Sequence, residues 1–194
     1  MKKYFILISF VVIVITSITF LGCERDDICS EATSTTPHLI IRFYDIDNPN
    51  NLKQVRQLEI VGLDENDMPL SEDILSRTET DSINLPLNFQ DQDVITTTRF
   101  QLEKNADYSD DVDSDGEQDL TTSSNPDIIS ITYTPEFIYV SRACGYKSIF
   151  NLDETQGIQR DGSAQGDDDT WITSFEIINQ TIENENAAQI IIYH

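Results

Sequence analysis

A run of alternating aspartates between residues 111 and 119 is the part of this chain best suited to chemistry. The spacing is D-x-D-x-D-G-x-x-D, with Gly116 as the glycine. Alternate carboxylates on a sharp turn can converge on one hard cation, and calcium prefers six to eight such oxygens. The spacing therefore predicts a Ca²⁺ site, with a backbone carbonyl near Glu117 completing the shell; the alternative is a solvated acidic hairpin tip. The predicted carboxylate ligands are Asp111, Asp113, Asp115 and Asp119.

The first of the three cysteines, Cys23, closes an export signal. Lys2 and Lys3 precede an apolar run over residues 4–21, which is the layout of a signal peptide. The end of the run, Phe-Leu-Gly-Cys, resembles the bacterial lipobox. That resemblance implies cleavage before Cys23, a diacylglycerol on its sulfur and an acyl chain on its freed amine. The alternative is an uncleaved signal anchor, because the apolar run reaches the lower limit of roughly 17 residues for a membrane span.

The two remaining cysteines, Cys29 and Cys144, form an even pair in a chain that the signal sends to an oxidising compartment. The sequence therefore predicts a disulfide between them. The alternative is that Cys144 is a nucleophile paired with His38, but no recognisable catalytic motif surrounds either residue.

The elements that would position these residues are short strands. Runs rich in β-branched and aromatic residues alternate with Gly, Pro, Asn and Asp clusters, and no long helical pattern occurs. The pattern predicts an all-β fold, an antiparallel β-sandwich that is immunoglobulin-like or similar. A helical turn is expected at residues 71–75, a turn at 135–136 and a long loop at 156–170. The expected strands are residues 38–45, 55–63, 81–85, 94–102, 128–134, 137–141, 145–152, 171–178 and 189–193.

Three segments follow from these patterns. Residues 1–22 are the expected signal peptide, residues 23–37 a lipid-anchored tether, and residues 38–194 the β-sandwich domain. The length of the last segment suits one domain with one core.

Charge and missing motifs exclude several classes of function. The chain carries 35 Asp and Glu against 12 Lys and Arg, so its formal net charge is −23. Such a surface repels nucleic acid and favours cations or basic partners. With two histidines and no H-E-x-x-H, G-x-S-x-G, P-loop or G-x-G-x-x-G motif, the sequence offers no catalytic constellation, and we expect no enzyme.

The segment V-S-R-A-C-G-Y-K at residues 140–147, together with residues 37–45 and 83–88, resembles an uncharacterised family of Bacteroidetes-type lipoproteins, a domain of unknown function. The resemblance implies a lipid anchor and a β-rich envelope domain, and it brings no activity or catalytic residues. The expected location is the outer membrane, on its periplasmic or its surface-exposed face.

Two classes of function remain open from the sequence. The favoured one is a structural or interaction module, lipid-anchored at the outer membrane, whose partner is another envelope protein such as an outer-membrane barrel. The alternative is a glycan-binding or hydrolytic accessory at the cell surface. Carbohydrate sites use exposed aromatic platforms, but the single tryptophan, Trp171, lies in a strand pattern where core packing is expected.

Overall fold

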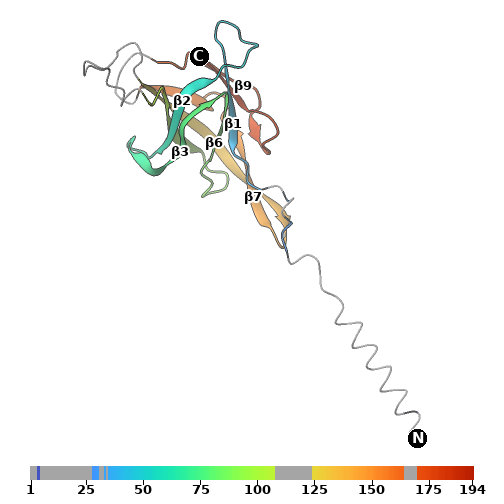
Figure 1. Cartoon of the computed structure of the whole chain (residues 1–194). Coiled ribbons are helices and arrows are strands. Elements are labelled where there is room, and N and C mark those ends of the chain that lie inside the picture. Colours follow the sequence, from blue (N-terminus) through green and yellow to red (C-terminus); the bar gives the residue numbers. More distant parts are fainter. Residues whose placement is uncertain (1–3, 5–27, 31–32, 34, 108–123, 164–169) are drawn as a thin grey trace, which may run out of the picture. The chain divides into compact units, whose positions relative to one another are not determined.

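The computed structural model describes residues 4, 28–30, 33, 35–107, 124–163 and 170–194 (Figure 1). The chain divides into two compact units. The smaller unit contains residues 1–33 and 139–146, and the larger contains residues 34–138 and 147–194. In the described residues no helix is long and apolar enough to cross a membrane.

One sheet of the larger unit has four strands in the order β4-β1-β11-β9. Strand β1 pairs antiparallel with β4 but parallel with β11, and Ile41 lies opposite Ile190 in that parallel pair. Figure 1 shows blue β1 and red β9 in the same part of the fold, although they lie far apart in the sequence. The four strands are β1 (Leu39–Tyr44), β4 (Ser82–Leu85), β9 (Ser174–Ile177) and β11 (Ile190–Tyr193).

The second sheet has seven strands, in the order β10-β7-β6-β5-β2-β3, with β8 also pairing with β6. Five neighbouring pairs of this sheet are antiparallel: β10 with β7, β2 with β3, β2 with β5, β5 with β6, and β6 with β8. The register between β5 and β6 is long, from Thr96 opposite Tyr133 to Lys104 opposite Asn125. The strands are β2 (Val55–Leu63), β3 (Pro69–Thr80), β5 (Thr96–Lys104), β6 (Asn125–Ser141), β7 (Gly145–Leu152), β8 (Ile158–Ser163) and β10 (Thr181–Ile182).

The two sheets share a single buried cluster of apolar side chains, so the predicted β-sandwich is confirmed. Alternation along β1 and β2 places one face of each strand in this core, as a half-buried strand requires. Aromatic rings fill its centre: Tyr133 and Phe150 meet edge-to-face with ring centroids 5.3 Å apart. Trp171 is only 7% exposed and its ring lies 6.0 Å from that of Phe43, so the expectation of core packing for the tryptophan is confirmed.

Three expectations about local structure are wrong. Residues 71–75 are part of strand β3, with no helical turn. Residues 135–136 continue strand β6, and the first half of the expected long loop at 156–170 contains strand β8, which spans Ile158–Ser163. For β3 and β8, pairing with a neighbouring strand overrides the local signal: β3 pairs with β2, and β8 pairs with β6, where Ile129 lies opposite Arg160.

Candidate functional site

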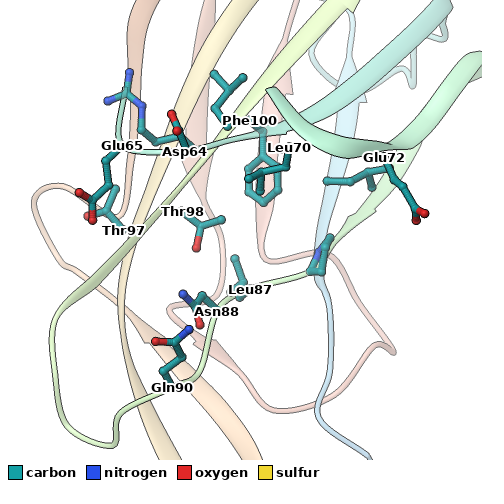
Figure 2. A pocket seen from close by; sticks show the side chains of 15 residues that line it. Asp64, Glu65, Leu70, Glu72, Leu87, Asn88, Gln90, Thr97, Thr98 and Phe100 are labelled. Atoms are coloured by element: carbon teal, nitrogen blue, oxygen red, sulfur yellow. The ribbon is translucent and has the colours of Figure 1, made fainter. Parts of the chain in front are cut away.

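An open groove of about 920 Å³ runs along one margin of the larger unit (Figure 2). It lies between β3, which ends the seven-stranded sheet, and the segment that follows β4, which ends the four-stranded sheet. The end of β2, the turn after it and the first half of β5 supply the remaining wall. A volume of this size falls within the range of roughly 300–1,000 Å³ that is usual for ligand sites.

Apolar side chains line the middle of the groove. Phe100 and Leu87 are buried and form its floor, while Leu70 is 56% exposed. Gly62 makes room for Leu70, because a Cβ added at this glycine would lie 3.2 Å from the Cδ1 atom of Leu70. Large apolar side chains on the surface of a soluble domain are a sign of an interaction site when they gather at a hollow.

The rim of the groove is acidic. Figure 2 shows Asp64 and Glu65 on one side of Leu70 and Phe100, and Glu72 on the other. The Asp64 carboxylate accepts hydrogen bonds from the backbone N–H groups of Met68 and Asn66, at 2.9 and 2.8 Å, and these lower its pKa. It therefore stays ionised at neutral pH.

The cation in the lining, Arg99, leaves this negative rim intact. Its guanidinium lies 2.8 Å from the carboxylate of Asp67, which offsets its charge. The groove thus offers an apolar centre between carboxylates, which suits a segment that carries apolar and basic side chains.

A buried tyrosine fixes the wall that follows β4. The Tyr133 hydroxyl donates to the backbone carbonyl of Asn88 at 2.8 Å and lies 2.7 Å from the Thr98 hydroxyl. Burial raises the pKa of Tyr133, so the hydroxyl keeps its proton and remains a donor. Strands β5 and β6 and the segment after β4 are thereby joined at the groove.

The predicted disulfide is present in the smaller unit. Cys29 and Cys144 are joined, with their Cα atoms 4.8 Å apart, so this prediction is confirmed. Cys144 lies in the turn between β6 and β7, where its backbone N–H donates to the Ser141 hydroxyl at 3.0 Å. The next residue, Gly145, has φ of +70°, a left-handed conformation that favours glycine.

The alternative of a nucleophilic Cys144 is therefore wrong, because a disulfide sulfur carries no thiolate. His38 has another partner: its Nδ1 atom lies 2.7 Å from the carboxylate of Glu185. That carboxylate also accepts the backbone N–H of His38 at 2.8 Å, and both bonds lower the pKa of Glu185.

The remaining predicted sites lie outside the described residues. These are the lipidation site Cys23 and the calcium ligands with Glu117, so both stay predictions. Within the described part of the chain, no three His, Cys, Asp or Glu side chains gather in a way that could hold a metal ion.

Sequence reasoning missed the groove. Its residues come from four separate segments and include no motif that carries chemistry. One signal was present in the sequence. Leu70 follows the acidic turn at residues 64–67 and is followed by Glu72, so an apolar side chain stands among acids. Only the folded structure shows that these residues line one groove together with the segment after β4.

The described residues form an all-β sandwich with a groove beside strand β3. The chain belongs to DUF6452, a family of unknown function, whose model matches residues 57–194. The matched range contains every residue of the groove and Cys144, but it begins after Cys29 and β1. Searches of curated proteins and of solved structures gave no match.

Proposed function

We propose that this protein is a lipid-anchored module of the cell envelope that binds a segment of a partner protein in the groove between β3 and the chain after β4. The observation that carries the proposal is the groove itself, with its exposed Leu70 set between Glu65 and Glu72. The export signal and Cys23 supply the proposed location, at the outer membrane.

The chemistry of the groove describes the partner. An apolar side chain of the partner would replace water over Leu70 and Phe100, and burial of apolar surface stabilises a complex by about 25 cal/mol per Å² before the costs of association. Lys or Arg side chains beside it would face the two glutamates. Because the whole chain has a net charge of −23, a basic partner would also associate faster than a neutral one.

Addition of a partner strand to β3 is less well supported than side-chain docking. The register between β2 and β3 shifts repeatedly, and Gln57 and Arg77 have positive φ values where it does so. Irregular, charged edge strands resist pairing with a further strand. We therefore propose that the partner binds in the groove and does not pair with the outer edge of β3.

A photo-crosslinking amino acid placed at Leu70 in the full chain, in intact cells, tests this function. We expect one discrete protein adduct in the membrane fraction. The matched control places the same amino acid at Ile178, which is 50% exposed and does not line the groove, and there we expect no such adduct.

Charge reversal then tests the role of the rim. The double variant Glu65→Lys with Glu72→Lys should lower the yield of the Leu70 adduct about tenfold, since each reversal replaces an attraction by a repulsion. Glu136→Lys with Glu154→Lys, two exposed positions outside the groove, should leave the yield unchanged. Equal adducts at Leu70 and Ile178, or an adduct that survives the rim reversal, would show that the groove is not the partner site.

A further inference from the structure

The tip of the β6–β7 hairpin carries aromatic side chains that the core does not use. Tyr139 and Tyr146 are 55% and 69% exposed, and their rings meet edge-to-face with centroids 5.4 Å apart. Ile28, beside the disulfide in the same unit, is 83% exposed. Two tyrosines and an isoleucine exposed to water around a disulfide-linked turn indicate a surface that contacts another molecule.

The charge of this hairpin differs from that of the rest of the chain. Residues 137–152 contain no Asp or Glu, although the sequence has 35 of them, and they include Arg142 and Lys147. Arg142 is exposed at the tip. A hairpin segment that combines tyrosine with cations and lacks acids matches the composition of protein segments at a membrane–water interface, where the phenol ring lies among the headgroups.

Covalent geometry limits how far this tip can lie from an acylated Cys23. Six peptide units separate Cys23 from Cys29, and a fully extended chain of that length spans at most about 20 Å. The disulfide then joins Cys29 directly to the hairpin turn at Cys144. Without the disulfide, the anchor would be connected to the tip only through the whole tether and the folded domain.

We propose that the hairpin tip, formed by Ile28, Tyr139, Arg142 and Tyr146, rests on the phospholipid headgroups of the membrane that holds the anchor. This inference rests on the proposed lipid anchor but is independent of the groove. The tyrosines lie at headgroup level, Arg142 faces lipid phosphates, and the disulfide keeps the tip beside the anchor. The disulfide and the tip would thereby hold the smaller unit at the membrane surface.

The test places benzoylphenylalanine at Tyr139 or Tyr146 of the full chain in cells and analyses the adducts by mass spectrometry. We expect phospholipid adducts at both positions. The matched control places the same amino acid at Phe89, an aromatic residue that is 49% exposed in the larger unit, where we expect no phospholipid adduct. The variant Arg142→Gln should lower the yield of adducts with anionic phospholipid about fivefold, since one cation near a membrane surface contributes a factor of this size.

The outcomes separate this inference from the proposed function. A protein in the membrane fraction that gives no lipid adduct, or gives a protein adduct, at Tyr139 and Tyr146 would overturn the inference and leave the anchor intact. A protein found in the soluble fraction would overturn the anchor and this inference together, whereas loss of the Leu70 adduct alone would affect only the groove.

Discussion

Replacing both Cys29 and Cys144 by serine is expected to lower the free energy of unfolding by about 2 to 4 kcal/mol. The bond closes a loop with a sequence separation of 115 residues, and the chain-entropy model gives its largest effects for loops of this length. The loss of stability is smaller than this model gives, because the native state also gains conformational entropy around Cys29 when the bond is lost. Thermal melting should show a fall in Tm of about 5 to 12 °C for a chain of this size.

The matched control for the disulfide is Ser141→Ala, which removes only the hydroxyl that accepts the N–H of Cys144. We expect a loss of about 1 kcal/mol or less from this change. Wild-type protein treated with a thiol reductant should have the same Tm as the double serine variant. An unchanged Tm in that variant, together with free thiols at both cysteines in envelope material, would contradict the assigned bond.

The second large effect is expected from His194 on acidification. Its ring is 6% exposed, packed edge-to-face on Trp171 with centroids 5.5 Å apart. Burial is the largest cause, and the pKa of His194 falls from its usual 6.5 to about 4. The backbone carbonyl of Lys53 opposes this shift, the charges of Lys104 and Lys53 add to it, and the charge of Asp45 opposes it slightly. The native state therefore keeps this imidazole neutral.

The sign of the pH effect follows from proton binding. Between pH 6.5 and about 4 the unfolded chain holds a proton on His194 that the native protein does not, so the free energy of unfolding falls as the pH falls through this window. The full loss is about 2 to 3 kcal/mol. Above pH 6.5 both states are neutral and the residue adds no pH dependence.

Chemical denaturation at a series of pH values measures this effect. His194→Gln should remove the loss of stability between pH 6.5 and 5, while His38→Gln, a change at the half-exposed histidine, should retain it. The acidic groups with lowered pKa values, such as Asp64 and Glu185, act at lower pH. Burial raises the pKa of Glu59, and this group acts in the opposite sense, since the native state then binds its proton more tightly; it is present in both variants. The same fall in stability in the His194 variant would contradict the assignment.

Strands rich in β-branched and aromatic residues between turn clusters could be predicted from the sequence. The bounds expected for β2 and β7 are those observed, and β1 differs only at its ends. Strand β3 could not be predicted because its shifted register breaks the period of two, so Leu70, Ile74 and Leu75 resemble one face of a helix. Pro135 suggested a turn, but it lies beyond Tyr133, where the pairing with β5 ends, and no hydrogen bond of that ladder is lost there.

Pairing between strands that lie far apart in the chain could not be predicted from the sequence. Nothing in the chain indicates that β1 and β11 are parallel neighbours, because each is a plain apolar run. The groove depends on a second long-range pairing, that of β1 with β4, because this pair places the segment after β4. The disulfide was predictable for a different reason: once Cys23 is assigned to lipid, only one pairing of cysteines remains.

The most direct test of the central claim, a lipid-anchored envelope protein, is the mass of the N-terminal peptide of the protein isolated from cell membranes. We predict that the peptide begins at Cys23 and carries the added mass of a diacylglycerol and one acyl chain. In the matched variant Cys23→Ala this peptide should be absent and the protein should leave the detergent phase. An unmodified N-terminus at Met1, or detergent-phase partitioning that persists in Cys23→Ala, would contradict the account.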